Sequence, residues 1–270
     1  MSLRSVIKET LPEPIRRVLT GIFYGWHGSY ASWDDAAKKC SGYNSAAILQ
    51  KVKDAASKVR DGVAHYERDS VIFDEIQYSY PLLTGLLWSA ARRGGKLNVL
   101  DFGGSLGSTY YQNKIFLDSL NEVNWCIVEQ PEFVKEGRAL FSNGRLNFFY
   151  TVAECFKSFR IDLVLFSSVL QYLEKPYELL EQIIKEGPEI IIIDRTPFVA
   201  GEDRLTVQKV NPSIYKASYP CWFFNKEKFL GMFGDSYNLV LEFEALDRAN
   251  IKSEFLGFIF QKINNKTNPR

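Results

Sequence analysis

The sequence predicts an α/β fold with a mostly parallel sheet. From Lys96 onward, short apolar runs rich in β-branched and aromatic residues alternate with helical patterns, which is typical of βαβ units. Near the end of the chain, residues 237–243 and 255–263 both have a strand pattern, and no helix-sized segment separates them. We therefore expect a C-terminal hairpin that places one strand antiparallel to the others.

Residues 1–95 are expected to form an N-terminal helical cap. The acidic residues of 33–37 suit a helix N-terminus, and 48–59 carry apolar residues at helical spacing. A further helical pattern runs over 73–87, where Pro81 is expected to bend or restart the helix.

Residues 96–263 are expected to form the main domain. Its strands and helices are expected at the following positions: strands at 98–102, 124–129, 147–151, 162–166 and 190–194, and helices around 115–120, 133–140 and 177–184. Segment 196–224 is long for a βα connection, so we expect a substrate-side insertion that covers the carboxyl edge of the sheet. The polar tail 264–270 is expected to fray.

The composition points to a small-molecule partner. The chain has 33 basic and 32 acidic residues, and this balance argues against a protein that coats nucleic acid. No stretch reaches the roughly 18 apolar residues that span a bilayer. Four widely spaced cysteines are expected to be reduced, as in a cytoplasmic protein, and the two histidines give little support for a metal site.

The strongest site signal is the turn Asp101–Gly107, with the sequence DFGGSLG. Its glycines allow a tight turn and the close approach of a ligand, and the helix expected after it offers free N–H groups. Asp101 is placed to accept hydrogen bonds from a ligand's ammonium group. The G-x-G-x-x-G pattern fits poorly, because Ser105 and Ser108 replace its second and third glycines. A turn that merely needs small residues is the alternative.

A second signal comes one βα unit later, where the next strand is expected to end at Glu129. A carboxylate at this strand tip lies beside the glycine-rich turn and is able to bind both hydroxyls of a ribose.

With these two features, the chain resembles the S-adenosylmethionine (SAM)-dependent methyltransferases of the Rossmann-like, seven-stranded type, over about residues 96–262. The turn 101–107 corresponds to the first motif of that family, with Ser105 in place of the middle glycine, and 161–173 looks like its fourth motif. The resemblance implies SAM as the cofactor. The implied cofactor-binding residues are Asp101, Gly103, Gly104, Ser105, Gly107, Glu129, Gln130, Ser167 and, nearest to the adenine-binding position, Glu154.

Four phrases look like a narrower group of uncharacterised bacterial methyltransferases that are often encoded among surface-polysaccharide genes: 25–33, 101–110, 128–131 and 193–198. This likeness implies a sugar or glycan acceptor. The aromatic cluster 23–30 fits either a platform for a sugar ring or, more commonly, the small core of a helical cap.

Methyl transfer requires in-line alignment and, for a hydroxyl acceptor, removal of a proton. Candidates lie after the fourth and fifth strands: Asp194 as general base, Arg195 to orient the substrate, and Tyr172 as a lid or catalyst. A purely structural Asp194–Arg195 pair is an equal alternative. An NAD-dependent oxidoreductase or epimerase and a non-catalytic SAM-binding scaffold also remain open. The natural acceptor and the oligomeric state are not indicated.

Overall fold

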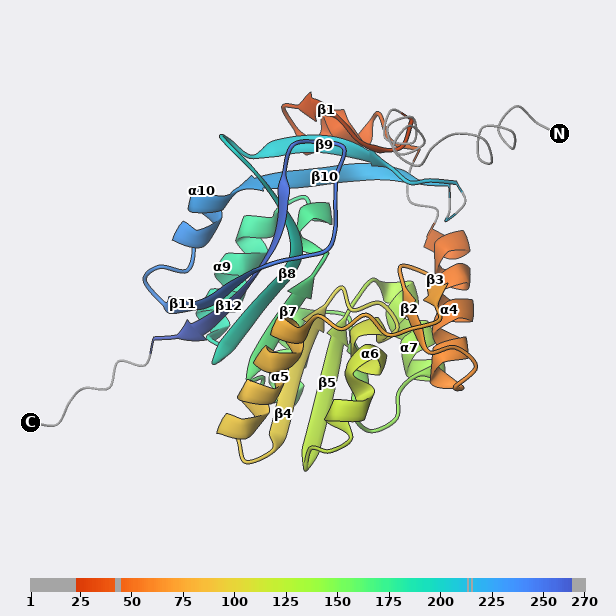
Figure 1. The fold of residues 1–270 in the computed structure, drawn as a ribbon, viewed down its shortest axis with the longest axis vertical. Helices are drawn as coiled ribbons and strands as arrows, with labels where there is room; N and C mark the ends of the chain where they lie inside the picture. Colours follow the sequence, from red (N-terminus) through yellow and green to blue (C-terminus); the bar gives the residue numbers. More distant parts are fainter. Residues whose placement is uncertain (1–22, 42–44, 213, 215, 264–270) are drawn as a thin grey trace, which may run out of the picture.

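The central sheet of the computed structural model has the strand order β6–β5–β4–β7–β8–β12–β11 (Figure 1). The structure describes residues 23–41, 45–212, 214 and 216–263. The strands are β4 (Lys96–Phe102), β5 (Glu122–Val128), β6 (Leu146–Phe149), β7 (Leu163–Ser167), β8 (Ile190–Val199), β11 (Tyr237–Glu244) and β12 (Glu254–Lys262). Neighbours from β6 to β8 are parallel, whereas β12 is antiparallel to both β8 and β11. The predicted mostly parallel sheet and its C-terminal hairpin are confirmed.

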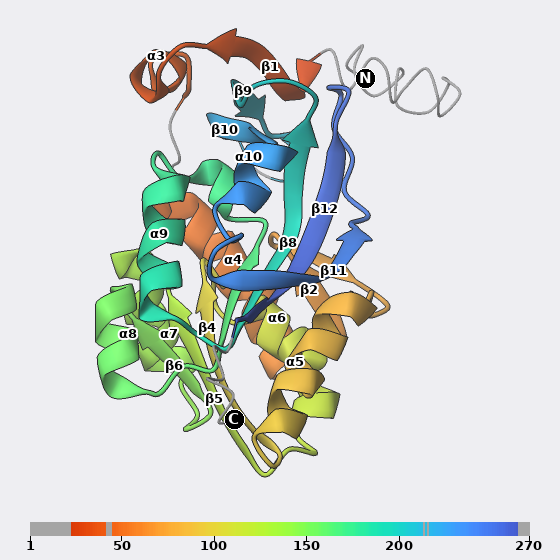
Figure 2. The ribbon, with the colours of Figure 1, turned by 90° about the vertical axis from the view of Figure 1, so that its left-hand side faces the viewer.

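Helices cover both faces of this sheet (Figure 2). One face packs against α4 (Ser45–Arg60), α5 (Tyr80–Arg92), α6 (Ser108–Leu117) and α7 (Pro131–Leu140). The other packs against α8 (Val152–Ser158), α9 (Pro176–Glu186) and α10 (Lys226–Gly231). Because both faces of the parallel strands are covered, these strands carry apolar runs, such as the fully buried Ile190–Ile193, whereas most of β11 is exposed.

Two helices begin elsewhere than the sequence suggested. α5 begins at Tyr80 with Pro81 in its first turn, which needs no N–H from that residue, so the expected restart of the helix at Pro81 is confirmed. A Cβ on Gly85 of α5 would come within 2.6 Å of Ile192, so α5 belongs to the sheet core. The helix expected around 115–120 is α6, which starts at Ser108, directly after the glycine-rich turn.

The N-terminal region is not purely helical. Besides α3 (Trp33–Ala37), α4 and α5, it contains β1 (Gly25–Tyr30), β2 (Tyr66–Arg68) and β3 (Val71–Phe73). The segment 66–73 forms a hairpin, so Phe73 belongs to a strand and not to the helix expected there. β1 has two glycines and no alternating pattern, and it is a strand only because it pairs with β9, far along the chain.

The expected insertion is a β-structure and not a loop. β9 (Arg204–Lys209) and β10 (Ser218–Asn225) are antiparallel to each other, and β1 adds to β9. We call these three strands the small sheet; it crosses above the carboxyl edge of the central sheet (Figure 1).

β8 connects the two sheets through a bulge. Ile193 pairs with Phe258 and Thr196 pairs with Leu256, so two residues, Asp194 and Arg195, lie opposite one residue of β12. Arg195 has a left-handed conformation, with φ of 53°. Beyond the bulge, β8 runs parallel to β10 at Phe198.

Within the described ranges, no helix has both the length and the apolar character needed to cross a membrane. All four cysteines carry free thiols, three of them buried. The predicted fraying of 264–270 lies outside the described residues.

Candidate functional site

A cavity of about 1180 Å³ lies at the carboxyl edge of the central sheet. Its walls come from the ends of β4, β5, β7 and β8, from the β2–β3 hairpin and from the small sheet. The strand order reverses between β4 and β7, and ligands of open α/β sheets bind at such a switch point. The volume exceeds the roughly 300–1,000 Å³ that is usual for one small ligand.

The glycine-rich turn forms the floor of this cavity. Gly103, with φ of 70°, donates its N–H to the carbonyl of Val128 at 2.9 Å, which joins the ends of β4 and β5. Ser105 is left-handed, with φ of 55°, where the family pattern has a glycine. Such a conformation costs a non-glycine residue about 1 kcal/mol or more. Gly107 caps α6 in a left-handed conformation and is not part of the cavity wall.

Asp101 lies at the end of β4 and is 1% exposed. The indole N–H of Trp125 donates to its carboxyl group at 3.0 Å. Gly104 leaves room for that group, since a Cβ there would come within 2.5 Å of it. Burial raises the pKa of Asp101 to about 7, against the hydrogen bond from Trp125 and with help from the negative charge of Glu129.

Glu129 follows β5, at the tip of the strand beside the turn, as predicted. Its carboxylate accepts the backbone N–H of Gln130 at 2.6 Å. Burial raises the pKa of Glu129, although the backbone N–H groups of Gln130 and Ser105 oppose this. Glu129 and Gln130 both line the cavity.

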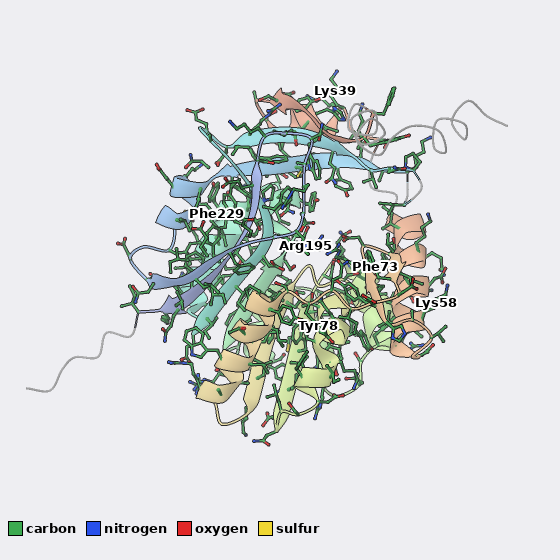
Figure 3. The ribbon with its side chains drawn as sticks, viewed as in Figure 1. Lys39, Lys58, Phe73, Tyr78, Arg195 and Phe229 are labelled. Carbon is green, nitrogen blue, oxygen red and sulfur yellow. The ribbon has the colours of Figure 1, made fainter. Side chains whose placement is uncertain are left out.

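Asp194 and Arg195 lie at the β8 bulge and have different partners. The hydroxyl of Ser167 donates to Asp194 at 3.2 Å, and burial raises the pKa of Asp194 to about 6 despite the positive charge of Arg195. Arg195 donates two hydrogen bonds of 2.9 Å to Asp247 and reaches Asp69 at 3.4 Å. Figure 3 shows Arg195 between β8 and the β2–β3 hairpin. Its charge is therefore already shared by two carboxylates.

Glu67 is a site residue that the sequence does not indicate. It belongs to β2 and is 2% exposed, and its carboxyl group accepts the hydroxyl of Ser108, the first residue of α6. The backbone N–H of Ser70 donates to it at 3.3 Å. Burial raises the pKa of Glu67 to about 7, against the hydrogen bond from Ser108. A single acid in a three-residue strand gives no sequence signal, because only the hairpin places it in the cavity.

Tyr172 and Glu154 have contrasting positions. Tyr172, in the short helix η1 (Leu170–Tyr172), lines the cavity and packs edge-on against Tyr219, with ring centres 5.2 Å apart. Glu154 lies outside the cavity wall, where it pairs with Arg138 at 3.0 Å and accepts the N–H of Tyr150. All predicted site residues except Glu154 and Gly107 line this cavity.

Acidic groups outnumber basic ones in the cavity wall. The acids that line it are Glu67, Asp69, Asp101, Glu129, Asp194, Glu244 and Asp247, and its bases are Arg68, Arg195 and Arg248. Seven carboxyl groups thus line the cavity with three guanidinium groups, and two of the seven, Asp69 and Asp247, are paired with Arg195. The cavity favours a cationic ligand over an anionic one.

No protein-family model matches the chain, and no curated protein sequence matches it. Solved structures with some similarity include the 1,6-didemethyltoxoflavin-N1-methyltransferase of Burkholderia thailandensis with bound S-adenosylhomocysteine (SAH). It is 14% identical, with 89% of this chain and 94% of that chain covered and a TM-score of 0.45. The N-terminal domain of EvdMO1, in the presence of SAH and D-fucose, is 12% identical, with 82% and 98% covered and a TM-score of 0.48.

A SAM-dependent methyltransferase from Methanosarcina mazei is 15% identical, with 69% of this chain and 99% of that chain covered and a TM-score of 0.47. The strand order of this chain, with parallel strands from β6 to β8 and an antiparallel β12, assigns it to the α/β class.

Proposed function

We propose that the chain is a SAM-dependent methyltransferase that methylates a hydroxyl group of a small molecule or sugar. The observation that carries this proposal is the acid-lined cavity at the switch point, with Glu67, Asp101 and Asp194 buried in its wall and their pKa values raised by burial. SAM is a net cation, because a sulfonium and an ammonium group outweigh its one carboxylate. A cation entering this cavity favours ionisation of these groups, whereas the pyrophosphate of a dinucleotide meets an excess of like charge.

Acidic residues of the turn, of β2 and of the end of β5 fit such a cofactor. Asp101 and Glu67 offer carboxylates to its ammonium group, and Glu129 offers one to the ribose hydroxyls. Gly103 and Ser105 have left-handed backbone conformations, and Gly104 lacks the Cβ that would come within 2.5 Å of the Asp101 carboxyl group. Glu154 would have to leave Arg138 before it could contact the adenine.

When bound, SAM supplies an activated methyl group at its sulfonium. Asp194 is proposed to accept the proton of the acceptor hydroxyl, since a pKa near 6 makes it a base close to neutral pH. Ser167 holds its carboxyl group, and Arg195 serves as a positioning residue that ties the bulge to Asp247 and Asp69. Tyr172 covers the same part of the cavity.

A surface glycan as acceptor and a cytoplasmic location are the finer parts of this proposal. The four free thiols support the location. The antiparallel hairpin and the acidic cavity count against an NAD-dependent oxidoreductase or epimerase, whose domain normally has a second βαβαβ half. A non-catalytic scaffold would bind SAM without turnover.

Calorimetry with SAM, SAH and NAD, together with mass spectrometry of copurified ligands, tests the cofactor. We expect SAM and SAH to bind and NAD not to bind. Failure of both SAM and SAH, or copurification of NAD, would overturn the proposal. Incubation of labelled SAM with cell-envelope glycans then separates an enzyme from a scaffold.

A further inference from the structure

The small sheet presents two different faces. Leu205 and Val207 of β9 pack with Ala36 of α3 in a separate apolar cluster. Because side chains alternate along a strand, Gln208 points to the other face, and it lines the cavity. β9 is thus held to α3 by one face, and Gln208 on its other face forms part of the cavity wall.

Gln208 is the centre of a row of three side chains. It pairs with Trp26 of β1 on one side and with Tyr219 of β10 on the other. Directly paired residues of antiparallel strands point to the same face, and all three line the cavity. We call Trp26, Gln208 and Tyr219 the ring-binding row.

The two aromatic members of the row are held in place. The indole N–H of Trp26 donates to the sulfur of Cys221 at 3.2 Å, and its ring packs edge-on against Phe223. Tyr219 packs edge-on against Tyr172. Fixed aromatic side chains offer a preorganised surface for the apolar face of a ring.

Gln208 supplies an unused hydrogen-bond acceptor. Its Oε1 is buried and has no hydrogen-bond partner among the described residues. A buried acceptor without a donor costs about 1–3 kcal/mol, and the Gln208 side chain lines the cavity, so a rotation of its amide that brings Oε1 to a ligand O–H is favoured.

The row is connected to the proposed base. Tyr219 touches Tyr172, and the N–H of Ser168, just before η1, donates to the carbonyl of Asp194 at 3.0 Å. The glycine-rich turn is on another wall, at the end of β4 (Figure 1). Because the cavity is larger than one small ligand needs, a second molecule has room between these walls.

We propose that the ring-binding row binds the methyl acceptor and selects an uncharged ring that carries hydroxyl groups. One hydroxyl donates to Oε1 of Gln208, and the ring lies against Trp26 or Tyr219. The row carries no charge, and Arg195, the cation nearest to the proposed base, is already paired with Asp247 and Asp69, so an anionic acceptor finds no free partner there. This inference rests on the proposed methyltransferase function.

The test uses the full chain saturated with SAH and a panel of small probes followed by saturation-transfer NMR and titration. One arm contains methyl glycosides of hexoses and deoxyhexoses, a second contains catechols, and a third contains hexose phosphates. We expect one of the two uncharged arms to bind, which also identifies the ring as a sugar or a phenol, and the phosphates to bind more weakly.

Variants assign the binding to the row. Gln208→Leu is expected to weaken the best probe roughly 5–10-fold, as the loss of one hydrogen bond predicts, while SAH affinity stays within about twofold. Gln208→Glu keeps an acceptor and is expected to retain the probe. Lys209→Ala, on the same strand and the opposite face, is the matched control. Gln208→Met replaces Gln208→Leu should the latter not fold.

Equal probe binding by wild type and Gln208→Leu, preference for hexose phosphates, or SAH binding without binding of any uncharged ring would overturn the inference. Failure of SAH to bind would instead overturn the proposed cofactor. The panel is then run without SAH, and the Gln208 variants still decide whether the row binds rings.

Discussion

Three carboxyl groups of the cavity are buried against neutral donors. Glu67 meets the hydroxyl of Ser108, Asp101 meets the indole of Trp125, and Asp194 meets the hydroxyl of Ser167. A neutral donor offsets less of the cost of burying a charge than a cation does, so burial dominates and raises all three pKa values, for Asp194 even against the positive charge of Arg195. Each group is therefore able to gain a charge when a cation binds.

Asp101→Asn is expected to weaken SAM binding by about tenfold or more, because a hydrogen bond to a charged group contributes roughly 1.5–3 kcal/mol. The amide still accepts from Trp125 and carries no charge to bury, so thermal stability at pH 8 is expected to rise. Calorimetry and thermal unfolding measure both effects. Glu122→Gln, an exposed acid on β5 that pairs with Lys96, is the control. Unchanged SAM affinity would contradict the role given to Asp101.

Asp194→Asn is expected to lower methyl transfer by about 100-fold or more, the usual range for loss of a general base, with SAH affinity retained. The comparison requires an acceptor from the probe panel and labelled SAM. Ser167→Ala, which only removes the hydroxyl that holds Asp194, is expected to have a smaller effect. Retained turnover in Asp194→Asn would exclude Asp194 as the base.

The site residues that could be predicted lie in or directly after strands of the central sheet. Asp101, Glu129 and Asp194 end runs whose strand character is local, so their common edge follows from the βαβ pattern. Glu67 and Gln208 could not be predicted, because they reach the cavity through a hairpin and a small sheet whose pairings are set by tertiary contacts.

At the scale of elements, the β2–β3 hairpin closes one side of the cavity with a strained turn. Its two central residues, Asp69 and Ser70, have φ of 53° and 65°, a geometry that favours Asn-Gly. Glu67 accepts the N–H of Ser70, and Asp69 pairs with Arg195. Asp69 suits its position in this turn but Ser70 does not, so contacts with the site help to hold the turn.

Ser70→Gly is expected to stabilise the protein by up to about 1 kcal/mol, because glycine adopts the left-handed conformation without strain. For a chain of this size, that corresponds to a rise in Tm of roughly 2–4 °C. The N–H that donates to Glu67 is retained, so SAM affinity is expected to stay unchanged. Thermal unfolding with and without SAM measures both quantities. A lower Tm would show that the serine side chain contributes more than the turn costs.

The elements of the central sheet were predictable, and those of the N-terminal region were only partly so. Buried parallel strands have apolar runs that are visible locally, as in β8. By contrast, β1 pairs with a strand far along the chain, and the turn at Asp69–Ser70 lacks the glycine that usually marks a hairpin.

At the scale of the whole molecule, the raised carboxyl pKa values predict an unusual pH dependence. The folded protein holds protons on Glu67 and Asp101 up to about pH 7 and on Asp194 up to about pH 6, whereas the unfolded chain releases them near pH 4. The folded state therefore binds more protons between these limits. The contribution of these groups to stability is complete below about pH 4 and is lost as the pH rises through 6–7.

Without ligand, the Tm is accordingly expected to fall between pH 5 and pH 8. SAM affinity is expected to rise over the same range, because the ionised carboxylates attract the cation. Thermal unfolding at several pH values, with and without SAM, tests both trends. Asp247 does not interfere: burial disfavours its charge, but Arg195 and Arg68 together with a backbone hydrogen bond outweigh burial and keep the pKa of Asp247 below its ordinary value. A stability that increases from pH 5 to pH 8 without ligand would contradict this account.

The bulge in β8 has one more consequence. A single unbroken strand carries Asp194 and, four residues later, pairs with the small sheet that holds Gln208 and Tyr219. The distance between the base and the acceptor is then set by a hydrogen-bonded β-ladder and not by a mobile loop. Changes of acceptor preference are therefore possible by exchanging side chains on β9 and β10, while the alignment of the transfer is preserved.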